Sequence, residues 1–203
     1  IELAPTKETM QFSSGQFIFI RFVGVGMSSE PHPFSISSAV SENNIKIAIK
    51  SLGDFTSSLG NVKAGTIAKV EGPFGNFYEN KDKKEIWIAG GVGITPFLSM
   101  ARSLKETNKE INLLYCLKNK NEAVFLNELE KISSEKKNFK VFSWFSEEKG
   151  FITGEAIRQI SNDVKNTDIY LCGPPVFMKM LQSQFIKMGV ENKNIYFEEF
   201  NFL

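Results

Sequence analysis

A glycine-rich segment, Ile88-Ala-Gly-Gly-Val-Gly-Ile-Thr-Pro-Phe97, has the residue types and spacing that could bind a phosphate group. It follows an apolar run and leads into a helical pattern with Pro96 near the first turn, a position that suits proline. Glycines let the backbone approach a pyrophosphate, whose charge is met by the amides and the positive dipole of the helix start. An ordinary turn between a strand and a helix is the alternative. The whole string after a buried strand favours a dinucleotide site.

A second candidate, Leu171-Cys-Gly-Pro-Pro175, also joins an apolar run to a helical pattern. At the carboxyl edge of a parallel sheet, such a loop faces the ligand crevice. We therefore expect Cys172 to line a nicotinamide pocket and Gly173 to permit close approach. The alternative is a buried, inert cysteine, which is the more common case for an isolated one.

Two earlier segments could hold a flat cofactor that carries phosphate. His32-Pro-Phe-Ser35 begins a strand pattern, and its imidazole, aromatic ring and hydroxyl could contact the phosphate, the ring and a ring nitrogen of a flavin. Lys50-Ser-Leu-Gly-Asp-Phe-Thr56 places a glycine turn before a short helix, a second possible phosphate cradle. Taken alone, the first segment is equally a surface histidine with a core phenylalanine, and the second an ordinary strand–helix turn.

The aromatic C-terminal segment, Tyr196-Phe-Glu-Glu-Phe-Asn-Phe-Leu203, allows two interpretations. It could be a terminal strand docked on the core, which is the usual outcome. It could also supply a ring that stacks on a flat cofactor.

The secondary-structure pattern that must position these segments differs between the first and second parts of the chain. In the first part, strand signals alternate with turns, and one short helical stretch spans Asp54–Leu59. Short strands with glycine-rich turns predict a small antiparallel β-barrel. The expected strands are Ile1–Leu3, Gln16–Val23, Phe34–Ser38, Asn44–Lys50 and Ile67–Glu71.

The second part alternates dense apolar runs with helical patterns, which predicts a doubly wound α/β domain with a parallel sheet. The expected strands are Glu85–Ala89, Ile111–Leu117, Phe139–Phe145 and Asp168–Cys172. The expected helices are Thr95–Thr107, Glu122–Ser133, Thr153–Ile160 and Pro175–Met188. The charged stretch Tyr78–Glu85 is the expected linker, so we place the two domains at residues 1–82 and 83–203.

Composition excludes several other classes of function. The 24 Lys and Arg residues nearly balance the 23 Asp and Glu residues, which argues against a nucleic-acid partner. Two cysteines and one histidine exclude a disulfide scaffold and an all-cysteine zinc or iron–sulfur site, so no metal site is expected within the chain. No apolar run reaches the roughly 18 residues of a membrane span, and no signal peptide opens the chain.

Taken in order, these strings resemble the ferredoxin–NADP reductase superfamily, and more narrowly the dehydrogenase domain of NADPH oxidases and transmembrane ferric reductases. The resemblance runs from about Gly15 to Leu203. The string His32–Ser35 is similar to the His-Pro-Phe-Thr/Ser string of the oxidase branch, where soluble reductases carry Arg-x-Tyr-Ser. The segments that resemble the family's nicotinamide motifs and its turn between domains are Gly91–Pro96, Cys172–Pro175 and Gly72–Gly75.

The resemblance implies FAD as a bound cofactor. The FAD-binding residues that it implies are His32, Pro33, Phe34, Ser35, Lys50, Gly53, Phe55, Thr56 and Phe200. Among them, His32 would contact the phosphates, Phe34 would pack on the isoalloxazine and Ser35 would hydrogen-bond near flavin N5. Phe200 would cover the other flavin face and move aside for the nicotinamide, with Phe202 as the alternative.

The resemblance also implies NADPH as the hydride donor, with NADH accepted as well. The residues that it implies for this nucleotide are Gly91, Gly93, Thr95, Pro96, Lys118, Cys172, Gly173 and Pro174. Lys118 lies where the oxidases place an arginine for the 2′-phosphate. Because lysine makes fewer oriented hydrogen bonds, we expect a weak preference for NADPH. Lys120 and Lys149 are alternatives for this role.

The expected function is hydride transfer from NADPH to FAD, followed by single-electron transfer to an acceptor, with Ser35, Cys172 and Phe200 as the catalytic residues. In the oxidase branch, a haem in a transmembrane domain of the same polypeptide accepts the electrons and passes them to oxygen, forming superoxide, or to ferric iron. The chain would then lie on the cytoplasmic side of the cell membrane. The alternatives are a soluble reductase for a ferredoxin, a flavodoxin or a ferric chelate, and a non-catalytic electron-bridging subunit.

Overall fold

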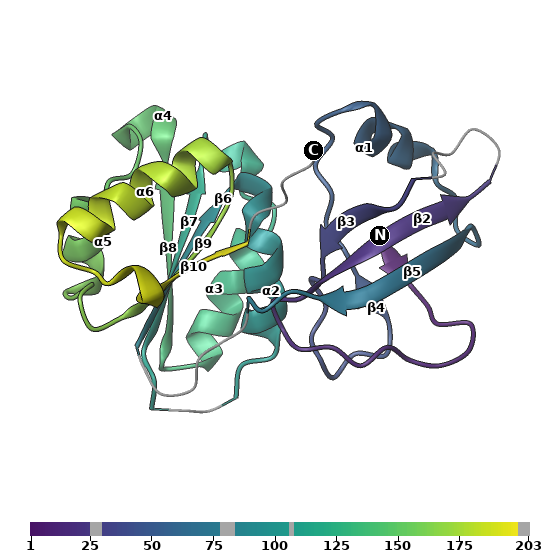
Figure 1. Cartoon of the computed structure of the whole chain (residues 1–203), viewed down its shortest axis with the longest axis horizontal. Helices are drawn as coiled ribbons and strands as arrows, with labels where there is room; N and C mark the ends of the chain where they lie inside the picture. The colour runs from purple at the N-terminus through teal and green to yellow at the C-terminus, as the bar shows by residue number, and fades with distance from the viewer. Residues whose placement is uncertain (25–29, 78–83, 106–107, 199–203) are drawn as a thin grey trace.

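The computed structural model shows a β-rich half and an α/β half lying side by side (Figure 1). The residues that it describes are 1–24, 30–77, 84–105 and 108–198. Helices α2 (Thr95–Arg102) and α3 (Leu126–Glu135) lie on the side of the parallel sheet that faces the β-rich half. The predicted two-part architecture is confirmed.

The β-rich half consists of short antiparallel strands around one apolar core. Three strands pair in the order β3-β2-β5, and β1 pairs with β4. An antiparallel bridge between Ile36 and Ile47 joins the two sheets, so the described strands form two linked sheets. The elements of this half are β1 (Glu2–Leu3), β2 (Phe17–Val23), β3 (His32–Ser35), β4 (Ile45–Lys46), α1 (Asp54–Ser58) and β5 (Ile67–Phe74).

Alternation along β2 shows why this half folds as it does. Ile18, Ile20 and Phe22 are buried in the core, whereas Phe17 and Phe19 are only partly buried on the opposite face. Alternation of this kind is expected of a strand with one face on the core.

The strand predicted over Asn44–Lys50 is shorter in the structure. Only Ile45 and Lys46 belong to β4, and Ile47 forms the isolated bridge. The physical reason is pairing, because the partner strand β1 is itself only two residues long. The alternating sequence pattern predicted which side chains point into the core, but it did not predict how many residues of β4 form backbone hydrogen bonds.

The α/β half contains a five-stranded parallel sheet in the order β10-β9-β6-β7-β8. The strands are β6 (Glu85–Gly90), β7 (Ile111–Leu117), β8 (Phe139–Phe145), β9 (Asp168–Cys172) and β10 (Ile195–Glu198). The remaining helices are α4 (Ser146–Lys149), α5 (Gly154–Ser161) and α6 (Pro175–Lys187). Every residue of β6, β7 and β9 is buried, which is why these strands read as continuous apolar runs.

Helices cover both faces of this sheet. Trp87 and Leu113 pack in one apolar cluster with Phe97 of α2. Ile88, on the opposite face, packs in a second cluster with Leu181 of α6. The sheet is therefore doubly wound, as predicted, and its carboxyl edge stays free of covering helices at the points where the loops begin.

Two predicted helices differ from the structure by more than one residue at an end, whereas α5 and α6 differ by one residue. The helix expected from Glu122 begins later, as α3 at Leu126, because Lys120–Glu122 form a separate 3₁₀ turn. Helix α2 ends at Arg102, because the backbone at Ser103 departs from helical geometry. Residues 106–107 of that expected helix lie outside the described residues.

The expected linker falls largely outside the described residues, which resume at residue 84. Glu85, which the sequence assigned both to the end of the linker and to the start of a strand, is the fully buried first residue of β6. Its carboxylate lies 2.9 Å from the ammonium of Lys109, which is nearly buried as well. The domain boundary near residue 82 stays a prediction.

Hydrogen bonds from α2 hold the two halves together. Ser99 Oγ donates to the carbonyl of Ser38 at 2.7 Å, and Arg102 Nη1 donates to the carbonyl of Ser37 at 2.5 Å. Glu128 orients Arg102 through two further hydrogen bonds of 2.6 and 2.8 Å. Because Ser37 and Ser38 follow β3, these bonds set the position of β3 against the α/β half.

Candidate functional site

The two glycine-containing loops predicted to bind a nucleotide touch each other. Gly93 packs so closely that a Cβ atom built on it would lie 2.3 Å from the carbonyl oxygen of Cys172. A Cβ on Gly173 would lie 3.0 Å from the Cα of Gly90, and Gly173 has a φ of 158°. The sequence positions these loops because β6 and β9 are neighbouring parallel strands whose carboxyl ends meet at one edge.

The chain leaves β6 through a 3₁₀ turn, Gly91–Ile94, that opens into α2. Gly91 has a φ of 58°, a left-handed value that favours glycine, and no atom lies within 4 Å of a Cβ built on it. Thr95 Oγ1 donates to the carbonyl of Val92 at 3.0 Å, and Pro96 is buried in the first turn of α2. Gly91 thus leaves open space at the turn, whereas Thr95 and Pro96 maintain its shape.

Cys172 is buried, and its raised pKa favours the protonated thiol at neutral pH. Burial raises the pKa of the thiol, and the nearby carboxyl group of Glu198 raises it further. The side chain belongs to the core cluster on the α2 and α3 face of the sheet. Cys172 can therefore contribute a neutral thiol and the shape of its loop to the site, and Pro174 continues that loop into α6.

On the other side of the site, β3 and α1 place three rings together. The rings of His32 and Phe55 stack at 3.5 Å with an interplanar angle of 16°, and Phe34 lies 6.4 Å from Phe55. Alternation along β3 turns Pro33 and Ser35 to the opposite face, where Ser35 pairs with Phe17 of β2. The structure thus brings His32, Phe34 and Phe55 together but separates Ser35 from them.

The loop before α1 hydrogen-bonds within itself. Thr56 Oγ1 accepts from the backbone amides of Leu52 and Gly53 at 2.9 and 3.0 Å. The ammonium of Lys50 points across to the α/β half and lies 3.3 Å from Oε1 of Glu122. In this structure the predicted phosphate-binding groups of this loop are therefore engaged with protein partners.

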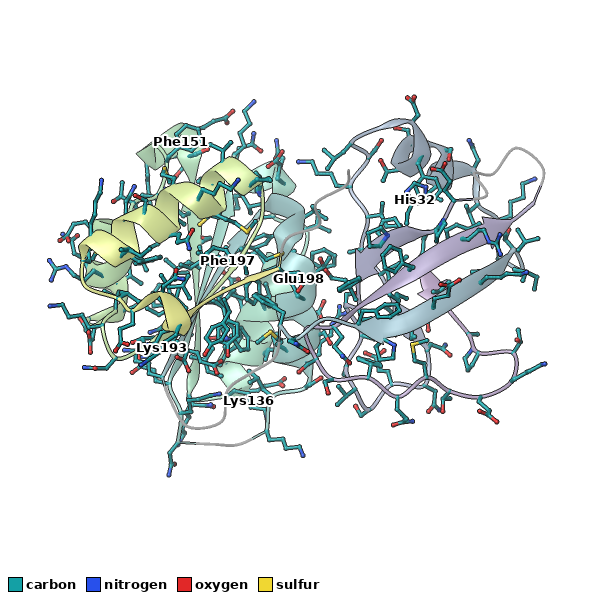
Figure 2. The ribbon with its side chains drawn as sticks, in the orientation of Figure 1. His32, Lys136, Phe151, Lys193, Phe197 and Glu198 are labelled. Atoms are coloured by element: carbon teal, nitrogen blue, oxygen red, sulfur yellow. The ribbon has the colours of Figure 1, made fainter. Side chains whose placement is uncertain are left out.

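Sequence reasoning gave no role to one buried group at this site, the carboxyl of Glu198. It lies at the end of β10, beside Cys172 in the strand register, and is only 7% exposed. Burial raises its pKa from 4.5 to about 7, and the described residues offer it no hydrogen-bond or ion-pair partner. Figure 2 shows Glu198 on the side of the α/β half that faces the β-rich half. An acidic residue placed directly after the apolar run Ile195-Tyr-Phe was the signal that could have revealed it.

Two cavities border these groups. The smaller, of about 410 Å³, is lined by Glu198, Gly75 and Phe17, among others, so both halves contribute to it. The larger, of about 660 Å³, lies between Thr56 and Ser57 of α1 and Arg102 of α2. Cavities of this size suit parts of a dinucleotide cofactor. Phe200 and Phe202, the expected flavin cover, lie outside the described residues.

Comparison with known proteins decides the family. A model of the oxidoreductase FAD-binding domain matches residues 1–78, and a model of the oxidoreductase NAD-binding domain matches residues 87–183. A probable dihydroorotate dehydrogenase B (NAD(+)) electron transfer subunit of Methanocaldococcus jannaschii is 30% identical, with 88% of this chain and 67% of that protein covered. The chain belongs to the ferredoxin–NADP reductase superfamily.

Other relatives in this superfamily carry further domains. Flavohemoprotein A of Dictyostelium discoideum is 31% identical, with 82% of this chain and 46% of that protein covered. The solved FAD/NAD-binding domain of nitric oxide dioxygenase from Vibrio cholerae is 25% identical with a TM-score of 0.84, and the match covers 98% of this chain and 90% of that one. The chain spans about half the length of the flavohemoproteins that it matches.

The buried nitrogen Nε2 of His32 tests whether the residues of the β-rich half suit a bound FAD. His32 Nε2 is inaccessible to solvent and has no hydrogen-bond partner among the described residues. An unsatisfied buried nitrogen is costly, and a phosphate oxygen of a bound cofactor would satisfy it. Figure 2 shows His32 beneath α1. The residues present therefore fit an FAD molecule whose phosphates reach His32.

The lysines expected at the far end of the nucleotide site are only partly available. Lys118 follows β7, and its ammonium lies 3.5 Å from the carboxylate of Glu147. Lys149 lies over the indole of Trp144 at 5.2 Å. In the described part of the chain, no helix is long and apolar enough to span a membrane.

Proposed function

We propose that the chain is a module that transfers electrons from NAD(P)H through FAD to a partner, with residues 1–82 holding FAD and residues 83–203 holding the nucleotide. The observation that carries this proposal is the contact between the two glycine loops in the α/β half, and the unsatisfied buried nitrogen of His32 in the β-rich half supports it. One loop leaves room for a pyrophosphate, and the other forms the wall of a nicotinamide pocket.

Bound FAD would supply the redox chemistry, since a flavin accepts a hydride from nicotinamide and releases electrons one at a time. His32 would hydrogen-bond to the flavin phosphates, and Phe34 with Phe55 would form an aromatic wall. The resemblance also gives the Ser35 hydroxyl a hydrogen bond near flavin N5, although Ser35 lies on the face of β3 opposite His32 and Phe34. The FAD-binding family match and the stacked rings support the assignments of His32, Phe34 and Phe55.

On the nucleotide side, Gly91 and Gly93 would let the pyrophosphate approach the backbone. Gly173 would do the same for the nicotinamide, and the neutral thiol of Cys172 would border the reacting ring without attacking it. Glu198 would hold a proton near neutral pH, because burial has raised its pKa to about 7. No described group in this arrangement needs to act as a strong acid or base.

The electron acceptor is expected to be a separate domain or protein. The electron-transfer subunit and the flavohemoproteins that match the chain support an acceptor of this kind. The string His32–Ser35 favours a second candidate, a haem in a transmembrane domain of the same polypeptide, which would place this chain on the cytoplasmic side of a membrane. Oxygen or ferric iron would then be the terminal acceptor. Apolar spans with paired histidines, encoded upstream of Ile1, would distinguish this acceptor from a soluble partner.

The proposal is tested by adding FAD to the purified chain and then NADH or NADPH without oxygen. We expect FAD to raise the melting temperature, and either nucleotide to bleach the flavin absorbance, with ferricyanide reduced on later addition. Absence of both a thermal shift and bound flavin at saturating FAD contradicts the proposal. Bound flavin that neither nucleotide bleaches would indicate a non-catalytic docking subunit.

A further inference from the structure

The adenosine half of the nucleotide should extend over the ends of β7 and β8. The glycine turn follows the central strand β6, and the nicotinamide wall formed by Cys172 and Gly173 lies on the β9 side. The rest of the molecule must then run the opposite way along the carboxyl edge. The chain segments at that end are Lys118, which follows β7, and α4, which follows β8. Figure 2 shows Phe151, just after α4, at this end of the α/β half.

Lys118 is held between two carboxylates at this edge. Its ammonium lies 3.5 Å from Glu147 Oε1, and its carbonyl accepts a hydrogen bond of 3.0 Å from the backbone amide of Glu147. Its own amide donates to Glu122 Oε2 at 3.3 Å. That backbone hydrogen bond lowers the pKa of Glu122, which is therefore an anion at neutral pH. The positive charge of Lys118 is thus balanced before any nucleotide arrives.

Two of the neighbouring lysines have protein partners as well. Lys50 pairs with the second oxygen of Glu122, and Lys149 lies over Trp144. Of the three arginines in the sequence, Arg102 binds Glu128 and Arg158 binds Glu155. Arg21 lies in β2 of the β-rich half. A 2′-phosphate at this edge would therefore lie near the Glu147 carboxylate, and none of the three arginines would be placed to bind it through two hydrogen bonds.

We propose that Glu147 makes this chain prefer NADH to NADPH, an inference that rests on the proposed function. The Glu147 carboxylate accepts a hydrogen bond from the 2′-hydroxyl of the adenosine ribose and repels a 2′-phosphate. Acidic side chains near the edge of nucleotide-binding sheets select NAD in this way, whereas arginine accommodates the phosphate. Lys118 orients Glu147 and does not serve as a phosphate ligand, which reverses the preference expected from the sequence.

The test compares two ligands that differ only in the 2′ group, ADP-ribose and 2′-phospho-ADP-ribose, by calorimetric titration of the FAD-supplemented chain. We expect the wild type to bind ADP-ribose at least tenfold more tightly. Glu147→Gln should reduce this ratio about tenfold, and Glu147→Lys should reverse it. Glu148→Gln is the matched control, because it removes the same charge one residue away and no ion pair joins Glu148 to Lys118 among the described residues. It should change the ratio less than twofold.

Flavin bleaching by NADH and NADPH gives the second measurement and separates the two proposals. If neither ADP-ribose compound binds and neither nucleotide bleaches the flavin, the proposed function fails and this inference fails with it. If both compounds bind equally well, or the phosphorylated one binds better, the inference alone is overturned. An equal effect of Glu147→Gln and Glu148→Gln also overturns the assignment to Glu147. Both side chains are solvent-exposed, and melting temperatures confirm that the variants fold.

Discussion

The nucleotide side and the flavin side of the site are built by different means. On the nucleotide side, backbone packs against backbone, and a Cβ on Gly93 would overlap the Cys172 carbonyl at 2.3 Å. On the flavin side, the comparable glycine, Gly53, has open space around it, and the shape comes from the stacked rings of His32 and Phe55. The first arrangement can change only by distorting the sheet edge, whereas the second can change by rotating side chains. We therefore expect substitutions to affect stability on the nucleotide side and cofactor affinity on the flavin side.

The pair Gly93→Ala and Gly53→Ala gives the largest expected contrast. Alanine at 93 must displace the Cys172 backbone, so we expect a loss of about 3 kcal/mol of unfolding free energy together with loss of nucleotide binding. Alanine at 53 has room and an extended φ of −161°, so its unfolding free energy should change by less than about 0.5 kcal/mol. Chemical denaturation measures both. Equal losses for the two variants would contradict the distinction between the two sides.

Glu198 adds a pH dependence where the two sides meet. Because burial raises its pKa from 4.5 to about 7, the folded protein binds this proton more tightly than the unfolded chain does. Its stabilising contribution is complete below pH 4.5 and is lost as the pH rises through 7. At about 1.4 kcal/mol per pKa unit, the loss is roughly 3 kcal/mol. Glu198→Gln should remove this part of the pH dependence, and an unchanged stability profile between pH 5 and 8 would show that Glu198 is not buried as described.

His32→Phe tests the flavin side, because it should raise the stability of the FAD-free protein and lower its affinity for FAD. The variant keeps an aromatic ring to stack on Phe55 but removes the unsatisfied Nε2. Without FAD, the unfolding free energy should rise by about 1 kcal/mol, because a buried polar atom is gone. FAD affinity should fall tenfold or more, since a hydrogen bond to a charged group contributes about 1.5–3 kcal/mol. Melting curves with and without FAD measure both, and a fall in stability without FAD would assign His32 a structural role only.

Phe200 has the smallest expected effect, and it lies outside the described residues. As a flavin cover it would contribute about 0.5–1.5 kcal/mol of stacking, so Phe200→Ser should weaken FAD retention and speed flavin reduction by NAD(P)H. Phe200→Trp should do the reverse. Stopped-flow reduction measures the rates. If Phe200→Ser lowers the melting temperature equally with and without FAD and leaves reduction unchanged, Phe200 belongs to the core and Phe202 becomes the candidate cover.

Much of the α/β half could be predicted because its signals are local. The strands β7, β8 and β9 have the bounds that their apolar runs predicted. Burial on both faces explains the continuous runs of β7 and β9, whereas β8 is a partly buried edge strand. The glycine turn could be predicted equally well, because few residues other than glycine adopt the backbone conformation that it requires. The length of β4 could not be predicted from its own residues, because it depends on the length of its partner strand β1.

The sequence by itself determined the superfamily, the two-part architecture and the place of the two glycine loops at the ends of strands, because periodicity and glycine spacing are properties of neighbouring residues. Only the tertiary structure decided the state of individual side chains. It buried Glu198 beside Cys172, left His32 Nε2 without a partner in the described part of the chain, and paired Lys118 with Glu147. Each of these depends on groups brought together from separate strands, and a charge or a hydrogen bond responds to its surroundings in space rather than to its neighbours along the chain.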